Sequence, residues 1–240
     1  MTEKSPQLNA GAAPDPSPRA VLFDVDGTLV DTNDLHAAAW REAFLHFGHD
    51  VTLEAIRWQV GKGGDNLIPS LLPDVSEEEQ ARMEAWRGDL YQQSYMPRAV
   101  PFEGVRALFE RLVAEGLRVV LASSSSEAEV GYYLSLLGVE DLVSATTSKD
   151  DVGSSKPCPD IFEAAVGKAG VAADEAIVVG DSVWDVKAAG KAGLRAIGFR
   201  SGGFPDAALL EAGACALFDG PADLLARFDS SVFARHAETV

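Results

Sequence analysis

Short apolar runs alternate with amphipathic stretches along the second half of the chain. The runs LRVVLAS, AIVVGD and LRAIGF are short, and the stretches between them carry apolar residues at helical spacing. Runs of this kind are typical of buried parallel strands, and the longer periodic stretches are typical of amphipathic helices. The alternation therefore predicts an α/β fold with a mostly parallel sheet covered by helices on both faces. The expected strands span residues 21–23, 117–123, 141–147, 176–181, 194–199 and 215–218, and the expected helices of this half span residues 103–115, 127–137, 159–169, 183–192, 206–212 and 222–228.

The stretch between the first strand and residue 100 has a different pattern, because it is helical throughout. Apolar spacing predicts a helix over 35–47 and a second one over 53–60 that Thr52 caps. Ser76 and Glu79 predict a capping box at the start of a third. No strand is expected before Val100. About seventy helical residues exceed what a crossover between parallel strands needs, so the pattern predicts an inserted all-helical cap domain.

These patterns divide the chain into a Rossmann-like α/β core of residues 19–33 and 101–228 and a helical cap of residues 34–100. The first residues are rich in Pro, Ala, Ser and Gly and have no apolar h-region. We therefore expect a disordered leader over 1–18 rather than a secretory signal. Residues 229–240 carry scattered charge with weak periodicity, and we expect them to form a loose C-terminal tail.

Composition and charge exclude several classes of function. The 240 residues, 47% of them hydrophobic, can bury a large core as one domain or as a domain with an insert. A formal net charge of -17 opposes binding to nucleic acid or to an anionic membrane, and no apolar run approaches membrane-spanning length. Cys158 and Cys215 offer no disulfide framework and suit a reducing, cytoplasmic compartment. We expect a monomer or a weak dimer.

Polar side chains follow the predicted strands where these end. Asp24 and Asp26 come directly after the first strand, and Ser123 and Asp181 end two later ones. Because parallel strands end at the same edge of a sheet, these side chains should gather there. Plainer interpretations exist for each: Asp-Gly and Gly-Asp-Ser turns are common, serine clusters usually cap helices, and a lysine before proline, as at Lys156, is usually solvated. Their joint occurrence favours a common site.

Several carboxylates at one edge suit a hard cation such as Mg²⁺, which takes oxygen ligands and leaves room for a substrate phosphate. One carboxylate can attack phosphorus as a nucleophile, and its neighbour two residues away can act as general acid and base. The Lys156 ammonium and the Ser123 hydroxyl would hold the phosphoryl oxygens. The sequence thus predicts a phosphoryl-transfer site that captures phosphorylated ligands through local cations.

Four motifs, in order, resemble those of the haloacid dehalogenase superfamily, specifically its phosphatases with a helical C1-type cap, over roughly residues 19–228. DVDGT looks like the first motif, which implies Asp24 as nucleophile and Asp26 as acid/base. The same motif implies that both residues bind Mg²⁺, Asp26 through its main-chain carbonyl. LASS resembles the second motif through Ser123, and SSKP resembles the third through Lys156.

The fourth stretch, GDSVWD, resembles the fourth motif and implies Asp181 as a metal ligand and Asp185 as the residue that supports it. Family members that dehalogenate or cleave carbon-phosphorus bonds lack the second acid, so Asp26 favours phosphoester hydrolysis. The resemblance is to the branch of phosphoglycolate phosphatases and β-phosphoglucomutase. It implies a Mg²⁺-dependent phosphomonoester hydrolase that acts on a small phosphorylated metabolite through an aspartyl-phosphate.

The substrate end of the site is expected to come partly from the cap. The loop VGKGGDN would contribute Lys62 and Gly63, although its three glycines equally suit a plain helix-breaking turn. Ser124 and His36 are further candidate substrate contacts. His36 stands twelve residues after Asp24, as in β-phosphoglucomutase, whereas the loop lacks the arginine with which that mutase holds a second phosphate.

Two other functions stay open on the sequence. One is phosphoryl transfer of the β-phosphoglucomutase type. The other is a phosphate-binding regulator without turnover, although an acid/base beside the nucleophile weighs against mere binding. Trp184, next to the fourth motif, either walls the pocket or packs beneath it.

Overall fold

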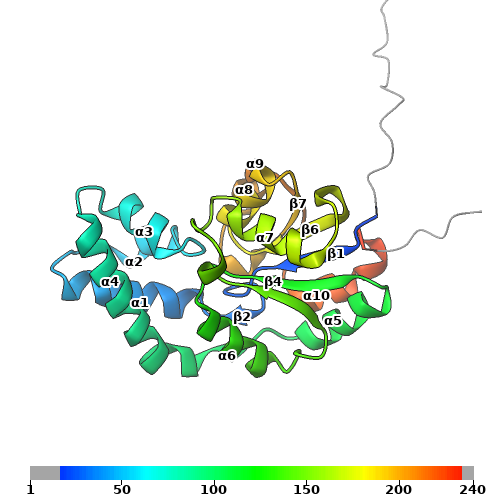
Figure 1. Ribbon diagram of the computed structural model, residues 1–240, viewed down its shortest axis with the longest axis horizontal. Helices are drawn as coiled ribbons and strands as arrows, with labels where there is room; N and C mark the ends of the chain where they lie inside the picture. Colours follow the sequence, from blue (N-terminus) through cyan, green and yellow to red (C-terminus); the bar gives the residue numbers. More distant parts are fainter. Residues whose placement is uncertain (1–16, 234–240) are drawn as a thin grey trace, which may run out of the picture.

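The computed structural model describes residues 17–233 and shows a parallel sheet between helices, with a helical segment at one end (Figure 1). The sheet has six parallel strands in the order β5-β4-β1-β6-β7-β8, and β2 and β3 form a separate antiparallel pair. The α/β class and the parallel sheet are thus confirmed. The strands are β1 (Ala20–Phe23), β2 (Val30–Asp31), β3 (Val100–Pro101), β4 (Arg118–Ala122), β5 (Val143–Thr147), β6 (Ala176–Gly180), β7 (Arg195–Phe199) and β8 (Ala214–Phe218). The helices are α1 (Asn33–His46), α2 (Leu53–Arg57), α3 (Gly64–Leu71), α4 (Glu77–Leu90), α5 (Val105–Ala114), α6 (Glu127–Leu137), α7 (Asp160–Ala169), α8 (Val183–Lys191), α9 (Asp206–Ala212) and α10 (Pro221–Ala226).

Strand β1 is central in the sheet, and all four of its residues are buried. Phe23 at its end pairs in parallel with Leu121 of β4 on one side and with Val179 of β6 on the other. The three strands therefore end at nearly the same level. Polar residues that follow them are brought to one edge, which is the requirement for a shared site.

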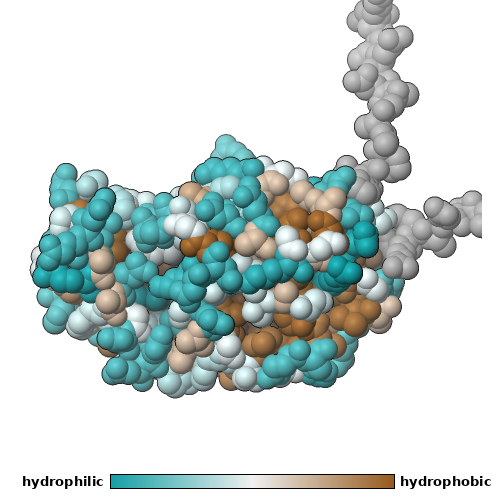
Figure 2. All heavy atoms as spheres, in the orientation of Figure 1, coloured by the Kyte–Doolittle hydropathy of each residue, from teal (hydrophilic) through white to brown (hydrophobic). Residues whose placement is uncertain are grey.

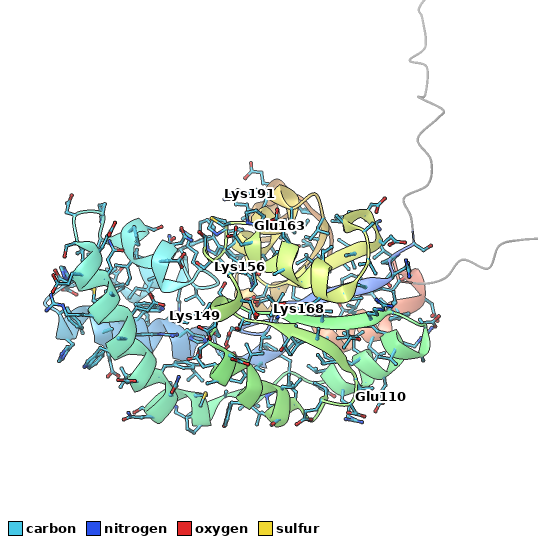
Figure 3. All side chains as sticks on the ribbon, in the orientation of Figure 1. Glu110, Lys149, Lys156, Glu163, Lys168 and Lys191 are labelled. Atoms are coloured by element: carbon cyan, nitrogen blue, oxygen red, sulfur yellow. The ribbon has the colours of Figure 1, made fainter. Side chains whose placement is uncertain are left out.

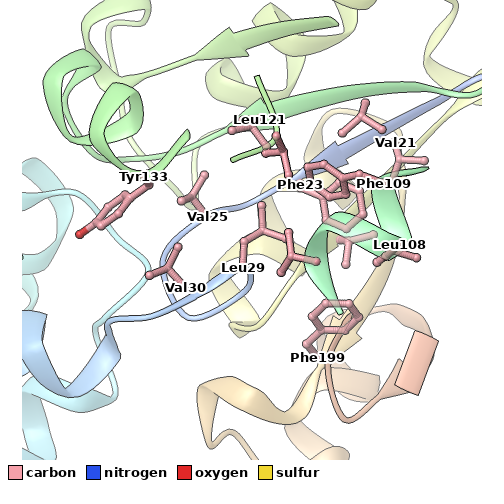
Figure 4. Packing of buried hydrophobic residues seen from close by; sticks show 14 of the residues in the cluster. Val21, Phe23, Val25, Leu29, Val30, Leu108, Phe109, Leu121, Tyr133 and Phe199 are labelled. Carbon is pink, nitrogen blue, oxygen red and sulfur yellow. The ribbon is translucent and has the colours of Figure 1, made fainter. Parts of the chain in front are cut away.

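The two faces of the sheet bury separate hydrophobic clusters. Val21 and Phe23 pack under α5, α6 and α10, and the Phe23 and Phe109 rings lie 4.9 Å apart between centroids (Figure 4). Ala20 and Leu22 project to the opposite face, where α7, α8 and α9 cover them. Successive residues of a strand alternate between faces, so an apolar run without polar interruptions is what a sheet covered on both sides requires.

Helices α1 to α4 lie between β2 and β3 and have a hydrophobic cluster of their own. Trp40, Phe44, Ile56, Leu67 and Met83 belong to this cluster. On the face drawn in Figure 2, the outer surface of this segment is mostly hydrophilic. Amphipathic helices that bury a core of their own can pack as a unit. We therefore interpret this segment as the cap expected over 34–100, and the domain boundaries stay an interpretation.

The expectation of no strand before Val100 is wrong. Val30 pairs with Pro101, and Asp31 pairs with Val100, so that the chain leaves for the helical segment and returns from it through two adjacent short strands. A strand of two residues is too short to leave a recognisable alternating pattern in the sequence.

The capping predictions of the cap helices hold in part. The Thr52 hydroxyl accepts the Ala55 N–H at 3.2 Å, as expected, but α2 ends at Arg57 rather than at residue 60. The Ser76 hydroxyl accepts the Glu79 N–H at 3.3 Å. The Glu79 carboxylate, however, binds His49 at 3.2 Å instead of returning to Ser76, so the predicted capping box is only half formed.

The end of the described chain is packed rather than loose. Phe233 is buried and its ring stacks on that of Phe228, 6.0 Å between centroids. The predicted tail over 229–240 is therefore wrong for residues 229–233, because Phe233 adds its apolar surface to the core. Most of the predicted leader, and residues 234–240, lie outside the described residues. Within 17–233, no helix has the length and hydropathy needed to cross a bilayer.

Candidate active site

The turn after β1 places two carboxylates at the edge of the sheet. The Asp24 N–H donates to the Val179 carbonyl at 2.9 Å, which extends the pairing with β6 by one residue. Val25, between the two acids, is fully buried in the core. Gly27 has a φ of 77°, which glycine adopts readily, so the chain turns tightly there. Asp24 and Asp26 flank the buried Val25 and both line the same cavity.

Lys156 and Thr28 hold the Asp24 carboxylate. Lys156 Nζ forms one ion pair with Asp24 and a second, at 2.7 Å, with Asp185. The Thr28 hydroxyl oxygen lies 3.1 Å from Asp24 Oδ2. Burial raises the pKa of Asp24 well above its ordinary value, and Asp185 and Asp181 add to this against the effect of Lys156. Burial alone would lower the pKa of Lys156, but the Asp185 and Asp24 carboxylates outweigh it and raise that pKa.

Asp24, Asp181 and Asp185 form a buried carboxylate cluster in which one oxygen of each lies within 4.8 Å of the others. The Thr28 hydroxyl and the Asn33 amide donate to Asp181 at 3.0 Å and 2.7 Å. Burial and the neighbouring Asp185 raise the pKa of Asp181 to about 7. Three carboxylates beside one ammonium leave negative charge that a divalent cation would offset, and oxygen atoms are the ligands Mg²⁺ prefers.

Two glycines leave space beside the Asp181 carboxylate. A Cβ atom on Gly27 or on Gly202 would collide with it. The Ser201 hydroxyl donates to the Gly27 carbonyl at 2.6 Å, which ties the two glycine turns together. Donor set, charge and space together fit a hard divalent cation. A contribution from the Asp26 main-chain carbonyl stays a prediction.

The Asp26 carboxylate has a different set of partners. It accepts hydrogen bonds from Thr32 at 2.9 Å and from Ser125 at 2.7 Å, and it contacts His36 Nε2 at 2.7 Å. Burial raises its pKa, but His36, Ser125 and Thr32 outweigh burial and lower that pKa well below the ordinary value. Arg87 donates to His36 Nδ1. Because arginine has no acceptor, Nδ1 must accept, so Nε2 carries the hydrogen donated to Asp26.

The four serines after β4, residues 123–126, make different contacts. Ser126 caps α6 in a complete capping box. The Ser123 hydroxyl accepts the Ser125 N–H at 3.0 Å and lies 3.4 Å from Asp26 Oδ2. Ser124 lines the cavity beside Asp24 and Asp26, and its buried hydroxyl has no hydrogen-bond partner within the described residues. The interaction of Ser125 with Asp26 was not predicted, because its spacing matches no motif.

A cavity of about 120 Å³ lies between the core and the helical segment. Figure 3 shows Lys149 and Lys156 near the end of the sheet that faces this segment. We call the part of its lining that the α/β core supplies the core wall and the part that the helical segment supplies the cap wall. The core wall includes Asp24, Asp26, Ser124, Ser125, Glu129 and Lys149, and the cap wall includes His36, Trp40, Gly61, Lys62, Gly63, Gly64, Leu67, Glu84, Arg87 and Gln92.

Arg87 is the cap-wall residue that the sequence did not reveal. It stands near the end of α4, and its guanidinium lies over the rings of Trp40 and Tyr91, at 5.1 Å and 4.7 Å from their centroids. The His36 ring in turn stacks on Tyr91 at 4.1 Å. The glycine loop indeed lacks an arginine, but the cap supplies one from another helix. A helical arginine between Trp86 and Gly88 carries no motif, so no local signal marks it.

The glycine loop makes mostly contacts within the protein. Lys62 Nζ donates to Gln59 at 2.6 Å and to Ser70 at 2.8 Å, and it lies 3.9 Å from the centroid of the Trp184 ring. Trp184 also donates its indole N–H to the Trp58 carbonyl at 3.1 Å, so it packs at the junction of core and cap. Substrate roles for Lys62 and Gly63 stay predictions.

Ser155, next to Lys156, links the core to the start of α3 through several hydrogen bonds. Its hydroxyl accepts the Gly63 N–H at 2.9 Å and the Asn66 amide at 3.1 Å, and it donates to the Asp65 carboxylate. The Ser155 N–H donates to the same carboxylate at 3.0 Å. The start of α3 is thereby fixed one residue away from the lysine that contacts Asp24.

The core wall has the parts that phosphoryl transfer needs. Asp24 is a buried carboxylate beside a fixed ammonium, and the cluster that it forms with Asp181 suits a divalent cation. A second carboxylate, that of Asp26, lies in the same cavity with its own hydrogen-bond donors. The candidate nucleophile and acid/base thus line one cavity, and the charge-neutralising groups lie buried behind them in contact with Asp24.

Known proteins are similar to this chain in sequence and in fold. The family described as haloacid dehalogenase-like hydrolase matches residues 18–193. A phosphoglycolate phosphatase of Yersinia pestis is 34% identical over 190 residues, which cover 77% of this chain and 82% of that protein. A hydrolase from Pseudomonas syringae superposes with a TM-score of 0.83 at 30% identity, covering 88% of this chain and 98% of that one. CbbY from Rhodobacter sphaeroides, in complex with phosphate, superposes with a TM-score of 0.70 at 27% identity, covering 86% and 96% of the two chains.

The matched range contains the whole carboxylate cluster, Lys156 and Asp26. The architecture agrees as well, since the related structures superpose over most of this chain. From sequence, fold and site together, the chain belongs to the haloacid dehalogenase-like hydrolases and is an enzyme of their phosphatase type.

Proposed function

We propose that the protein is a Mg²⁺-dependent phosphomonoester hydrolase that works through an aspartyl-phosphate. The observation that carries this proposal is the Asp24 carboxylate, buried beside Lys156 at the wall of the cavity. Asp24 attacks phosphorus and the bond to the leaving oxygen breaks, while Asp26 gives that oxygen a proton. Asp26 then takes a proton from water, which attacks phosphorus and releases phosphate and free Asp24.

Residues that adjoin the core wall bind charge in this scheme. Asp24, Asp181 and the Asp26 main-chain carbonyl would hold Mg²⁺, whose charge offsets that of the phosphoryl oxygens. Lys156 and the Ser123 hydroxyl hold phosphoryl oxygens as well, and Asp185 positions Lys156 through their ion pair of 2.7 Å. His36, Ser125 and Thr32 keep the pKa of Asp26 low in the resting site, so Asp26 must first take up a proton, from the bound phosphomonoester or from solvent, before it protonates the leaving oxygen.

The substrate in this proposal is a small phosphorylated metabolite, phosphoglycolate-like or a sugar phosphate. Support comes from the relative named phosphoglycolate phosphatase and from the cavity volume of about 120 Å³. The same proposal includes a cytoplasmic location and a monomeric or weakly dimeric state. Support for the location comes from the sequence, whose two cysteines offer no disulfide framework.

Phosphoryl transfer of the β-phosphoglucomutase type is the second candidate. It is favoured by His36 on the Asp26 carboxylate and by Arg87, a cap arginine that could hold a second phosphate. Interconversion of β-glucose 1-phosphate and glucose 6-phosphate faster than phosphate release would replace the hydrolase proposal with this one. A regulator without turnover is not pursued, because the chain belongs to a family of enzymes.

The proposal is tested by phosphate release from p-nitrophenyl phosphate and from a panel of phosphorylated metabolites, each with Mg²⁺. We expect turnover of p-nitrophenyl phosphate and clear selectivity within the panel. Absence of phosphate release from every compound, by protein whose circular dichroism is that of a folded α/β protein, would contradict it.

A further inference from the structure

Arg87 is a cation in the cap wall whose hydrogen-bonding capacity is largely unused. One of its nitrogens donates to His36 Nδ1. Its Nε is buried and has no hydrogen-bond partner in the part of the chain that the structure describes. Within the same residues Arg87 forms no ion pair, although the chain carries 37 acidic side chains. A buried donor of a charged group is costly when it is left unpaired, so this geometry indicates a partner that the protein itself does not provide.

The other cations around the cavity are already engaged. Lys149 forms an ion pair of 3.0 Å with Glu84, and Lys62 binds Gln59 and Ser70. Lys156 is held by the carboxylates of the core wall. Arg87 is therefore the cation best placed to receive an anionic group of a ligand.

The orientation of Arg87 is fixed before any ligand arrives. Its guanidinium lies over the Trp40 and Tyr91 rings, and its contact with His36 fixes one edge. A planar guanidinium held in this way presents its remaining N–H groups as a fork, which suits a carboxylate better than a single acceptor. Arginine on an aromatic face also loses little freedom when it binds.

Size limits what can lie between Asp24 and Arg87. The cavity of about 120 Å³ is somewhat smaller than the cavity of about 150 Å³ that accommodates benzene in another protein. A phosphoryl group placed on Asp24 leaves room for a leaving group of only a few heavy atoms before the cap wall is reached. A hexose that carries a second phosphate exceeds this space, whereas a carboxylate on a chain of two or three carbons fits.

We propose that Arg87 binds a carboxylate on the leaving group and so makes the enzyme selective for short phosphorylated hydroxycarboxylic acids over neutral phosphoesters of the same size. This inference rests on the proposed function and adds to it the chemical class of the substrate. It also moves the determinant of specificity from the glycine loop, where the sequence suggests Lys62, to helix α4.

The test compares phosphoglycolate with 2-hydroxyethyl phosphate, in which a neutral group replaces the carboxylate. The measured quantity is the ratio of kcat/KM for the two compounds. We expect the wild type to favour phosphoglycolate and Arg87→Met to reduce this ratio by about 10- to 100-fold, as expected for loss of one charge-assisted contact. Arg87 also contacts His36, so turnover of both compounds will fall, but the ratio removes this common effect.

Two further variants separate specificity from general damage. Arg82→Met makes the same change on an exposed position of α4, and we expect it to leave both the ratio and the rates unchanged. Arg87→Lys keeps the charge but not the fork, and we expect a ratio between those of the wild type and Arg87→Met. Circular dichroism shows whether each variant is folded.

Binding without turnover gives a second measurement. Phosphonoacetate and 2-hydroxyethylphosphonate cannot be hydrolysed, and we expect phosphonoacetate to inhibit more strongly, with the difference lost in Arg87→Met. An unchanged kcat/KM ratio in a folded Arg87→Met protein would overturn the inference, as would a wild-type preference for the neutral compound or for a hexose bisphosphate. Failure to hydrolyse any phosphoester would instead refute the proposed function, and binding of the two phosphonates to the wild type and to Arg87→Met would still show whether Arg87 binds carboxylates.

Discussion

The core wall and the cap wall of the cavity are built on different principles. Asp24 of the core wall is buried at the end of β1, whose pairing with β4 and β6 fixes its position, and Lys156 and Asp181 are buried beside it. Arg87 and Glu84 stand on a helix that belongs to a separate hydrophobic cluster and are only partly buried. The sheet thus fixes the geometry of the core wall, whereas the geometry of the cap wall depends on how the helical segment packs on the core.

This difference suggests a division of labour. Groups that must hold a reacting phosphorus atom need fixed positions, and the sheet edge provides them. Groups that recognise the leaving group can vary without disturbing the sheet, because they stand on helices outside it that bury a hydrophobic cluster of their own. Changes in the core wall should therefore abolish chemistry, and changes in the cap wall should alter selectivity.

The largest effect is expected for Asp24→Asn. The amide keeps the shape of the side chain but is not a nucleophile, so turnover of p-nitrophenyl phosphate should fall by at least about 10⁴-fold. Circular dichroism should stay that of the wild type. Asp74→Asn, the same change at an exposed position, should keep full activity. If Asp24→Asn turned over substrate as fast as the wild type, the core wall would not supply the nucleophile, and the main difference between the two walls would be lost.

Removal of the metal is expected to be almost as severe. Turnover should fall by about 10²- to 10⁴-fold in excess EDTA, should return with Mg²⁺, and should be inhibited by Ca²⁺, whose larger and looser coordination suits the site poorly. Asp181→Ala should raise the Mg²⁺ concentration needed for activity or abolish activity. Full turnover in EDTA would show that the carboxylate cluster does not act through a cation.

Even without substrate, the stability of the folded protein should depend on pH and on Mg²⁺ through the carboxylate cluster of Asp24, Asp181 and Asp185. The pKa of Asp181 is raised to about 7 in the folded protein, so the folded state holds this proton more tightly than the unfolded state does. Without Mg²⁺ the protein should therefore lose stability as the pH rises from about 4 to about 7. Mg²⁺ at 100 times its Kd should add about 2.7 kcal/mol at pH 8 and less at pH 5, because it binds the ionised carboxylate. A Tm that does not respond to Mg²⁺ at pH 8 would contradict this.

A moderate effect, mainly on KM, is expected for a substitution of Ser155, which links the core to the cap. Ser155→Ala removes three hydroxyl contacts with the start of α3 but leaves the main-chain contact with Asp65. Loss of about 1 to 2 kcal/mol of hydrogen-bond free energy between the core and the start of α3 should raise KM by about 5- to 30-fold and change kcat less. Ser154→Ala, at the neighbouring serine, is the matched control. A fall in kcat without a change in KM would mean that Ser155 serves Lys156 rather than the cap.

The smallest effect is expected for Lys62→Ala. The ammonium is bound to Gln59 and Ser70, and burial together with Lys187 lowers its pKa. Since it is engaged within the protein, its loss should change kcat/KM for any substrate by no more than about fivefold. A larger change in kcat/KM that differs between substrates would show that the glycine loop contributes to specificity, and would weaken the assignment of specificity to Arg87 of α4.

The core wall could be predicted because its information is local. Each of Asp24, Ser123 and Asp181 directly follows an apolar run, and the rule that parallel strands end together is enough to bring them to one place. The same logic gave the parallel sheet. It did not give Asn33, whose amide donates to Asp181 from the start of α1, directly after β2. That strand is too short to be recognised from its sequence.

The cap wall could not be predicted in the same way. The position of Arg87 in the cavity depends on how α4 packs on α1, and no sequence period specifies which helical arginine faces a cavity. Glycines surround Lys62 in the sequence, but glycine spacing does not determine where a lysine side chain points. Likewise, Phe233 lies beyond the last periodic segment, and only the tertiary fold makes it part of the core.

The most direct test of the account is to trap the covalent intermediate. Protein mixed with substrate and Mg²⁺ is quenched in acid within one turnover, reduced with borohydride and digested, so that an aspartyl-phosphate becomes homoserine detectable by mass spectrometry. We expect homoserine at position 24 in the wild type and in Arg87→Met, and none in Asp24→Asn. Phosphate or homoserine at Asp26 or Ser123 during turnover, or none at any residue, would contradict it.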